Sequence, residues 1–312
     1  MKKEYILLFA LIVGLSAYLV VQSSGERHYT LPEPDTVKAT DIKKFEIVKN
    51  GDRTDVMKKD GAWSVTDRHF PADKAKVEEM ANAIEKLKVT ALVSEKKDFR
   101  RYGLNEDNRI KVTAKGDPGR TTRVFIGKVA PTRNHTFVRL EDDNRVYHAA
   151  GNLERIFNRS VSEIRNKQVI EIDRDGISSM EIKKNGRKKR LEKSEGRDGA
   201  PPSWQSETGS KIDEQAVQSL LANLTGLTCS KYLDMQNSEN QPGKNPFLTI
   251  TLEGDQAVSL EVFGKNDQGL YPARSSQNRY PFLIEEFKAE NIISDTDTIM
   301  GVKLEKSDEK AS

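Results

Sequence analysis

The chain has 312 residues, enough for two domains of ordinary size, and 32% of these residues are charged. Its 51 lysines and arginines nearly balance its 48 aspartates and glutamates, so the formal net charge is only +3. A nucleic-acid binder normally concentrates its positive charge in an arm or on one face, whereas here the two signs are interspersed almost everywhere along the chain. We therefore expect no nucleic-acid partner.

The N-terminus, residues 1–25, predicts a transmembrane anchor with a short cytoplasmic end. The stretch from Tyr5 to Val21 is almost wholly apolar, and about 20 apolar residues cross a hydrocarbon core of ~30 Å. Lys2 and Lys3 favour a cytoplasmic amino terminus. We expect a single-pass protein of the bacterial inner (cytoplasmic) membrane whose bulk is extracytoplasmic, or periplasmic. The competing interpretation is a cleaved signal peptide, whose apolar region is usually shorter.

Residues 26–40 predict a polar linker, because they contain Pro32 and Pro34 and few apolar residues. The chain has one cysteine, Cys229. An exported chain with one thiol has no internal disulfide, so the fold must depend on its hydrophobic cores. We expect Cys229 to be a buried, inert thiol.

A repeated heptapeptide gives the clearest information about architecture. FEIVKNG at residues 45–51 returns as MEIKKNG at residues 180–186, with five of the seven residues identical. Both copies alternate apolar and polar residues and end in Asn-Gly, the pattern of a β-hairpin with a tight turn. A tryptophan follows each copy, Trp63 and Trp204. We expect both in the cores, with sugar stacking as the alternative.

Two predicted helices repeat at an offset of 140 residues. The first begins after Asp73, a good N-cap, and runs to about Lys88; the second begins after Asp213. Both carry an apolar stripe at the spacing of one buried helix face. The stripe positions are Val77, Met80, Ala81, Ile84 and Leu87, and then Val217, Leu220, Leu221, Leu224 and Leu227.

Later strands repeat as well, which completes the domain prediction. Residues 110–116 correspond to 248–254, residues 126–128 to 263–265, and Arg139 to Arg274. Strands and helices do not alternate regularly, so we expect an α+β fold with mainly antiparallel sheets. The prediction is two tandem, internally duplicated sheet-plus-helix units, residues 41–165 and 166–297. A polar, disordered tail covers residues 298–312.

No pattern in the sequence predicts catalysis, a cofactor or a metal site. Ile126-Gly127-Lys128 lacks the second glycine and the Ser or Thr that a phosphate loop needs. The four histidines are His28, His69, His135 and His148, and no two of them lie at ligand spacing on one element. We expect a protein that is not an enzyme, although a pair of carboxylates brought together by folding remains an alternative.

A basic cluster begins within the second heptapeptide, continues directly after it, and is the one candidate docking surface. Its members are Lys183, Lys184, Arg187, Lys188, Lys189 and Arg190. Such a cluster attracts anionic headgroups or envelope polymers. The plainer interpretation is a solvated, lysine-rich hairpin edge that prevents strands of other molecules from pairing with it.

Several short motifs, taken in their order, resemble a bacterial family of domains of unknown function, DUF4340. They are Trp63, Tyr102-Gly103-Leu104, Ile126-Gly127-Lys128, Phe137-Val138-Arg139, Val146-Tyr147, and Arg165-Asn166-Lys167 before Val169. The resemblance covers most of residues 41–295. It implies membrane-anchored extracytoplasmic proteins, often encoded beside ABC-type transporters of the gliding-motility auxiliary class. No catalytic residues come with it.

The sequence therefore favours a non-enzymatic, membrane-anchored accessory or scaffold protein. The expected partners are the membrane, through Tyr5 to Val21, and a membrane complex such as an ABC transporter. The alternative is an envelope glycan- or lipid-binding module with a ligand site between the two units. An enzyme acting on envelope polymers ranks last.

Overall fold

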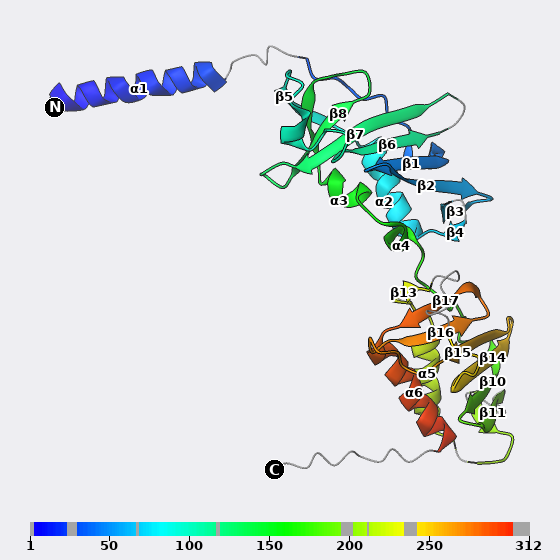
Figure 1. Cartoon of the computed structure of the whole chain (residues 1–312). Helices are drawn as coiled ribbons and strands as arrows, with labels where there is room; N and C mark the ends of the chain where they lie inside the picture. Colours follow the sequence, from blue (N-terminus) through cyan, green and yellow to red (C-terminus); the bar gives the residue numbers. More distant parts are fainter. Residues whose placement is uncertain are drawn as a thin grey trace. The chain divides into compact units, whose positions relative to one another are not determined.

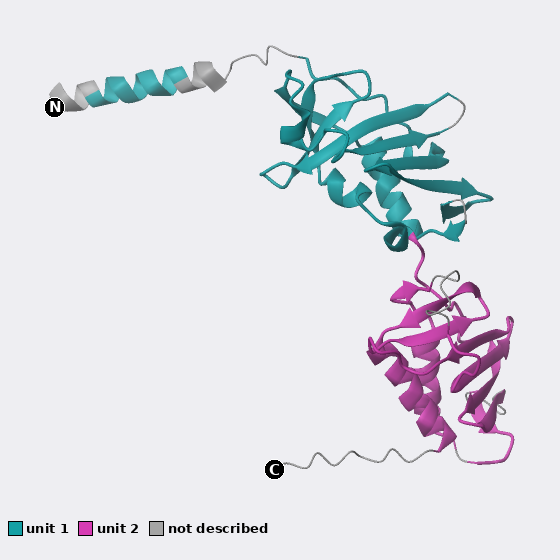
Figure 2. Ribbon diagram, in the orientation of Figure 1, with its two compact units in different colours: residues 1–164 teal, residues 165–312 magenta. Residues whose placement is uncertain are grey.

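The computed structural model describes residues 3–23, 30–66, 69–116, 119–194, 202–210, 212–233 and 242–301. The chain divides into two compact units (Figure 2), which we call unit 1 (Met1–Ile164) and unit 2 (Arg165–Ser312). This division lies one residue before the boundary that the sequence predicts.

Unit 1 contains an antiparallel sheet in the strand order β4-β3-β2-β1-β6-β7-β8-β9-β5 (Figure 1). Its strands are β1 (Lys44–Lys49), β2 (Asp52–Lys59), β3 (Ala62–Val65), β4 (Phe70–Pro71), β5 (Val89–Ser94), β6 (Ile110–Lys115), β7 (Thr121–Val129), β8 (His135–Leu140) and β9 (Val146–Ala150). Its helices are α1 (Lys3–Ser23), η1 (Ala39–Asp41), α2 (Lys74–Glu85), η2 (Phe99–Tyr102), α3 (Leu153–Phe157) and α4 (Val161–Ile164).

Unit 2 contains a second antiparallel sheet in the order β12-β11-β10-β14-β15-β16-β17-β13. Its strands are β10 (Ile177–Lys184), β11 (Arg187–Ser194), β12 (Ser203–Ser206), β13 (Lys231–Tyr232), β14 (Leu248–Gly254), β15 (Val258–Val262), β16 (Tyr271–Ser275) and β17 (Asn278–Ile284). Its helices are α5 (Glu214–Leu224) and α6 (Glu286–Met300). Apart from β4, the two sheets have the same strand order, and the predicted α+β class with antiparallel sheets is confirmed.

The two repeated heptapeptides form equivalent hairpins. The turn residues Asn50 and Gly51 have φ angles of 52° and 85°, and Asn185 and Gly186 have 49° and 78°. Two consecutive positive φ angles are typical of the type I′ turn, which matches the twist of a two-stranded ribbon. The hairpins predicted from Asn-Gly are therefore confirmed.

The predicted helix stripes form the cores of the two units. All ten stripe residues of the predicted helices are buried. The N-caps act as expected, because Asp73 accepts a hydrogen bond from the backbone N–H of Lys76 and Asp213 accepts one from that of Ala216. Helices α2 and α3 of unit 1, and helices α5 and α6 of unit 2, cover one face of the sheet of their unit (Figure 1). We call the opposite face the outer face.

Several predicted boundaries are wrong. The fold of unit 1 begins before residue 41, since Val37 is buried and donates its N–H to Thr122 Oγ1. Helix α2 ends at Glu85, short of Lys88. Helix α6 continues past residue 297, because Ile299 packs in the core and Gly301 at φ 72° ends the helix. The rest of the predicted linker and tail, residues 26–29 and 302–312, lies outside the described residues.

The strand register corrects one predicted correspondence. The sequence aligns residues 126–128 with 263–265, but the first residues of β6 and β14 pair with Ile126 and Val262 respectively. Val262 therefore occupies the place of Ile126, and the alignment is wrong by one residue. The strands also differ beyond this point, since β7 continues through a bulge after Ile126 to Val129, whereas β15 ends at Val262.

Helix α1 precedes the sheet of unit 1. Its described side chains run from Leu8 to Tyr18 and are all exposed. Among the residues that the structure describes, no helix combines the length and the apolar character needed to cross a membrane. The structure thus does not establish the span predicted from Tyr5 to Val21.

Candidate functional site

The six basic residues of the predicted docking surface lie on the β10–β11 hairpin, but on both of its faces. Residues paired across an antiparallel ladder point to the same side of a sheet. Lys183 pairs with Lys188, and Lys184 with Arg187. Lys189 pairs with the buried Ile182 and so belongs to the helix-covered face. The structure therefore does not bring all six together on one surface.

The basic residues on the helix-covered face hold the end of α6. Lys184 Nζ lies 2.6 Å from Asp297 Oδ1, and the two side chains are only 11% and 15% exposed. Lys189 Nζ donates a hydrogen bond to the carbonyl of Ile299 at 2.8 Å. These two lysines have a structural role, because they satisfy groups in the last turns of the helix.

The basic residues on the outer face are paired with carboxylates of unit 2. Glu181 lies 2.8 Å from Lys183 and 2.7 Å from Lys188, and these hydrogen bonds lower the pKa of Glu181 to about 2. Arg190 pairs with Glu253 at 2.9 Å, and also with Glu207. The charge of this cluster is thus largely compensated within the unit. Whether it serves as a docking surface stays a prediction.

Edge protection applies to only part of this hairpin. β12 lies outside β11 and pairs with its residues Leu191 to Ser194. No described strand pairs on that side with residues 187–189. The lysine-rich end therefore lies at the sheet margin, while the other end is covered.

A row of cations crosses the outer face of the first sheet. The cross-strand pairs place Arg53 beside Val48, Val48 beside Lys111, Lys111 beside Phe125, and Phe125 beside Arg139; these are the members of what we call the cationic row. The row runs over the adjacent strands β2, β1, β6, β7 and β8. Since neighbouring strands are ~4.8 Å apart, the backbone positions of successive cations in the row are about 10 Å apart.

More charges surround this row, and positive ones predominate. The outer-face cations are Lys44, Arg53, Lys111, Lys115, Arg123 and Arg139, and the carboxylates are Glu46, Asp55 and Glu141. Glu46 lies between Lys115 at 2.7 Å, Arg53 at 3.0 Å and Lys44 at 3.2 Å. The hydrogen bond from Lys115 is the main cause that lowers its pKa. A groove of about 370 Å³ lies here, lined by Lys111, Thr113 and their neighbours.

Arg139 ends the row in an aromatic setting. Its guanidinium lies 4.0 Å from the centre of the Phe125 ring and 5.3 Å from that of Phe99, while Arg109 lies 4.7 Å from Phe125. Burial lowers the pKa of Arg139, and the charge of Arg109 lowers it further. In the described chain Arg139 makes no ion pair: its Nη1 donates long hydrogen bonds of 3.5 Å to the carbonyls of Glu141 and Asp143, and its buried Nε has no hydrogen-bond partner. A cation held in this way is available to an external anion.

The motif residues around Arg139 form a small second core on the outer face. Leu104, Phe125, Ala130, Phe137 and Val146 are buried together, with Tyr102 packed against them. Gly127 permits this packing, because a Cβ at that position would lie 2.3 Å from the carbonyl oxygen of Tyr102 and 3.0 Å from Leu104 Cγ. The segment around η2 thus needs glycine beneath it, which links two motifs that are distant in sequence.

The sequence comparison adds the family to this geometry. The profile described as a domain of unknown function (DUF4340) matches residues 63–246, more than half of the chain. The chain belongs to the DUF4340 family. No curated protein and no solved structure matches it. The match begins at Trp63 and extends into unit 2, so the family profile includes parts of both sheets.

Two histidines lie at the rim of the small second core on the outer face of unit 1. The rings of His135 and His148 are stacked with their centres 5.5 Å apart, and Phe137 contacts His148 at 4.9 Å. Burial, and secondly the charge of His135, lower the pKa of His148, whose buried Nε2 has no hydrogen-bond partner. The described residues contain no group of three or more His, Cys, Asp or Glu placed to hold a metal ion.

Cys229 and the two tryptophans occupy packing positions. Cys229 is 3% exposed and burial raises its pKa, as expected for an inert thiol. Trp204 is buried, and Trp63 packs against Phe45 with ring centres 6.1 Å apart. These contacts fit core packing better than sugar stacking.

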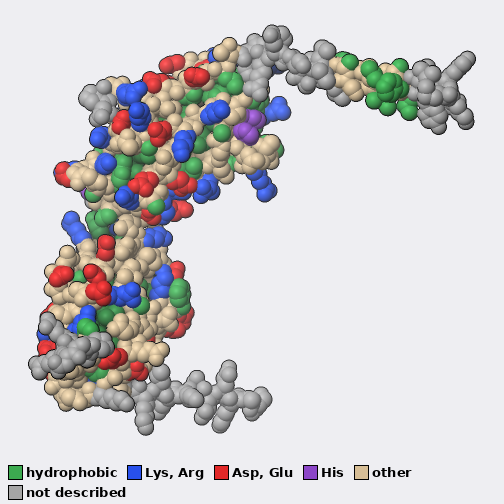
Figure 3. All heavy atoms as spheres, turned by 180° about the vertical axis from the view of Figure 1, so that it is seen from behind, with side chains coloured by type: hydrophobic (Ala, Val, Ile, Leu, Met, Phe, Trp, Pro, Cys, Tyr) green, Lys and Arg blue, Asp and Glu red, His purple; other side chains and the backbone are tan. Residues whose placement is uncertain are grey.

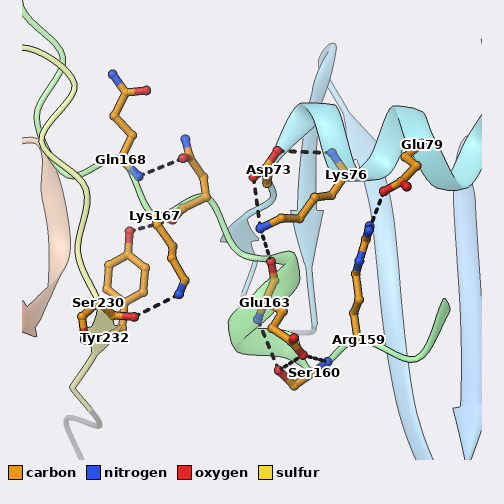
Figure 4. Close-up of polar contacts among 11 residues, drawn as sticks. Asp73, Lys76, Glu79, Arg159, Ser160, Glu163, Lys167, Gln168, Ser230 and Tyr232 are labelled. Atoms are coloured by element: carbon orange, nitrogen blue, oxygen red, sulfur yellow. Dashed lines mark hydrogen bonds and ion pairs between the residues drawn. The ribbon is translucent and has the colours of Figure 1, made fainter. Parts of the chain in front are cut away.

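The Arg165-Asn166-Lys167 motif fastens the first residues of unit 2 (Figure 4). Lys167 Nζ donates to the carbonyl of Ser230 at 3.0 Å, and the Tyr232 hydroxyl donates to the carbonyl of Asn166 at 2.8 Å. The guanidinium of Arg165 lies 3.7 Å from the centre of the Tyr232 ring. These contacts assign the motif a structural role, which the sequence pattern alone did not reveal.

Unit 1 fastens its own last helix in a comparable way. Lys76 Nζ donates to the carbonyl of Glu163 at 2.6 Å, and Arg159 pairs with Glu79 (Figure 4). The hydrogen bond from Arg159 is the main cause that lowers the pKa of Glu79. Helix α4 is therefore held against α2 by charge-assisted bonds.

A hollow of about 730 Å³ in unit 2 is lined by Tyr232, Phe263, Leu283 and neighbouring residues. Two of its lining residues, Leu233 and Pro242, flank residues 234–241, which lie outside the described structure. We assign no ligand to this hollow.

Proposed function

We propose that this DUF4340 protein is a non-enzymatic, membrane-anchored accessory protein that docks to an envelope complex such as an ABC-type transporter. The observation that carries the anchoring part is the exposed apolar surface of α1. Its large hydrophobic side chains are 50% to 69% exposed; they are Leu8, Phe9, Leu11, Ile12, Val13, Leu15 and Tyr18 (Figure 3). A helix that is apolar all round requires an apolar environment.

The sequence extends this argument to the length of the anchor. The uncharged stretch from Tyr5 to Val21 contains the exposed residues and continues past them at both ends. With Lys2 and Lys3 at the inner end, the remainder of the chain lies outside the cytoplasm. Both units are then extracytoplasmic, as the proposal requires.

The docking part is supported by the outer face that each unit has by itself. Each has helices on one face of its sheet, and each outer face carries several charged side chains. On the outer face of unit 2, Lys183, Lys188 and Arg190 are the members of the predicted docking surface that face away from α5 and α6. Such polar faces match the rim of a protein interface.

The anchor is tested by extracting membranes that contain the full chain with alkaline carbonate. We expect the wild-type chain to stay in the membrane pellet. The double variant Leu11→Arg, Leu15→Arg should be released, because each central arginine opposes insertion by about 3 kcal/mol. The control Leu11→Ile, Leu15→Ile should stay in the pellet. Release of the wild-type chain would refute the anchor.

Docking is tested by mild cross-linking in native membranes and purification through a C-terminal tag. We expect the wild-type chain to bring down a transporter subunit, and the variant Lys183→Glu, Lys188→Glu to bring down much less of it. The control Lys59→Glu, Lys97→Glu changes the same charge at two exposed positions of unit 1. A wild-type chain that stays monomeric and captures no membrane protein would overturn the docking proposal.

The alternative of an envelope glycan- or lipid-binding module, with a ligand between the units, stays a prediction. Ligand binding to the native state raises its stability. A thermal-shift screen of the detergent-solubilised chain against envelope glycans and lipid headgroups therefore tests it.

A further inference from the structure

We infer that the outer face of the first sheet binds the anionic headgroups of the bilayer that holds α1, and that the cationic row makes the contact. This inference rests on the anchoring part of the proposed function. It assigns a membrane-facing surface to unit 1, away from the basic cluster that the sequence singles out in unit 2.

The first argument compares the charges of the two outer faces. In unit 1, six cations share three carboxylates. In unit 2 the same face has six cations, Lys183, Lys188, Arg190, Lys231, Arg274 and Arg279, and five carboxylates, Glu181, Glu192, Glu207, Glu253 and Glu261. The surplus of positive charge on this face is therefore larger in unit 1, and such a surplus attracts external anions.

The second argument concerns cations that make no ion pair within the described part of the chain. Arg274 of unit 2 occupies the place of Arg139 and lies 4.0 Å from the carboxylate of Glu261, its neighbour across the ladder. In unit 1 that neighbour is Phe125, so Arg139 makes no ion pair in the described chain. Lys111, on the other side of Phe125, has none in this part of the chain either. Two of the three cations of the row therefore have no carboxylate partner in the described chain, which leaves their charge to an external anion.

The third argument concerns the shape and chemistry of the row. Its members lie on five adjacent strands, so the row is ~19 Å long, and Val48 and Phe125 separate the cations. An extended surface of this kind fits many headgroups side by side better than one small ligand. Guanidinium groups bind phosphate oxygens through two parallel hydrogen bonds, which suits Arg53 and Arg139 to phosphodiester headgroups.

The fourth argument is the length of the tether. Helix α1 ends at Ser23, and Val37 is already buried in the fold of unit 1. A chain of this length spans at most ~50 Å when fully extended. The outer face of unit 1 thus remains within reach of the bilayer surface on its own side, where the charge of anionic headgroups acts over about one Debye length.

Lysine acetylation of the full chain in vesicles tests the inference. One set of vesicles contains phosphatidylcholine alone, and the other equal parts of phosphatidylcholine and phosphatidylglycerol. We expect labelling of Lys111 and Lys115, measured by mass spectrometry, to fall about fivefold in the anionic vesicles. High salt should restore the labelling. Lys183 and Lys188 of unit 2 serve as internal controls and should label equally in both. Equal labelling of Lys111 in the two sets would overturn the inference.

Two further measurements distinguish a failed anchor and a free-anion site from the membrane contact. A chain that fails to float with phosphatidylcholine vesicles refutes the anchor, which is a different result from equal labelling. Protection of Lys111 by inorganic phosphate in detergent, to the same degree as by anionic vesicles, would show a site for free anions and would overturn the membrane contact.

A matched pair of variants tests the row itself. Lys111→Glu should abolish the protection of Lys115 in anionic vesicles, and Lys183→Glu should leave it unchanged. Thermal unfolding of each variant establishes that it is folded before labelling. Full protection of Lys115 in the folded Lys111→Glu variant would count against the row.

Discussion

In unit 1, β8 places Arg139 opposite Phe125, whereas in unit 2, β16 places Arg274 opposite Glu261. The two arginines have equivalent positions in sheets of the same strand order. Arg274 has an internal counter-ion, Glu261, whereas Arg139 has no ion pair in the described chain. The outer face can change in this way because no α-helix packs on it; in unit 1 it carries only the small second core beside η2, so most of its charge is constrained by solvent and not by the main core.

The faces that pack against the helices show the opposite behaviour. Phe45 in β1 pairs with Ala114, and at the equivalent positions Met180 in β10 pairs with Leu252. All four side chains are buried. A large residue beside a small one is replaced by two of intermediate size, so the volume of the pair is roughly kept. Close packing requires such compensation, and the apolar pattern therefore persists where individual residues change.

The largest effect is expected from truncation in the helix stripes. Met80→Ala and Leu220→Ala remove fully buried side chains at equivalent positions of α2 and α5, and each should cost about 3 kcal/mol of unfolding free energy. If each unit has its own separate core, Met80→Ala should increase amide hydrogen exchange in unit 1 alone. Leu220→Ala should then increase it in unit 2 alone. Each variant is the control of the other. Increased exchange in both units from either variant would contradict this picture.

The helices and hairpins could be predicted because their signals are local. Asn-Gly turns, Asp N-caps and a stripe of period 3.6 are all contained in short windows. The extent of α6 could have been found in the same way, since Ala289, Ile292, Thr296 and Ile299 lie at helical spacing and are buried. The edge strands β5 and β13 had no such signal, because they pair with β9 and β17, far away in sequence.

The candidate site could be predicted only in part. The basic cluster is contiguous in sequence, but neighbouring residues of a strand point to opposite faces, so Lys183 and Lys184 separate. The cationic row has the reverse property. Arg53, Lys111 and Arg139 are distant in sequence, and only the register of five strands brings them into one line. A single sequence does not encode that register in any local pattern.

The next largest effect is expected at a glycine of unit 1. Gly127→Ala places a methyl group 2.3 Å from the carbonyl of Tyr102, so the η2 segment must move, at a cost of about 2 kcal/mol. Gly264, with which the sequence aligns it, has no atom within 4 Å of an added Cβ. Gly264→Ala should therefore leave the urea midpoint almost unchanged. Similar losses from both substitutions would show that the two glycines are not distinguished by packing.

A smaller effect is expected from the lysines that hold the closing helices. Lys184→Met leaves the mostly buried Asp297 without its 2.6 Å partner and should cost about 1.5 kcal/mol. Lys49, at the equivalent position of β1, bonds Asn158 in an exposed setting. Lys49→Met should cost less than about 0.5 kcal/mol. Urea titrations of both variants measure the difference, and equal losses would contradict the assigned role of Lys184.

The smallest effect is a dependence of stability on pH in unit 1. The pKa of His148 lies below its ordinary value of 6.5, chiefly because of burial and secondly because of the charge of His135. The unfolded chain therefore binds a proton more readily than the native one, and stability is lost as the pH falls through 6.5 toward the lower native value. The urea midpoint of the wild-type chain should decrease between about pH 7.5 and about pH 5.5.

His148→Leu installs the residue that unit 2 has at this place, Leu283, opposite Pro272 as His148 is opposite Phe137. The variant should lose that part of the pH dependence, because leucine has no group that binds a proton. Substitution of the exposed His69 by leucine is the control and should keep the full dependence, since its ring is not in the aromatic cluster. An unchanged decrease in the His148→Leu variant would assign the pH dependence to other groups, and the two sheets would then not differ in this respect.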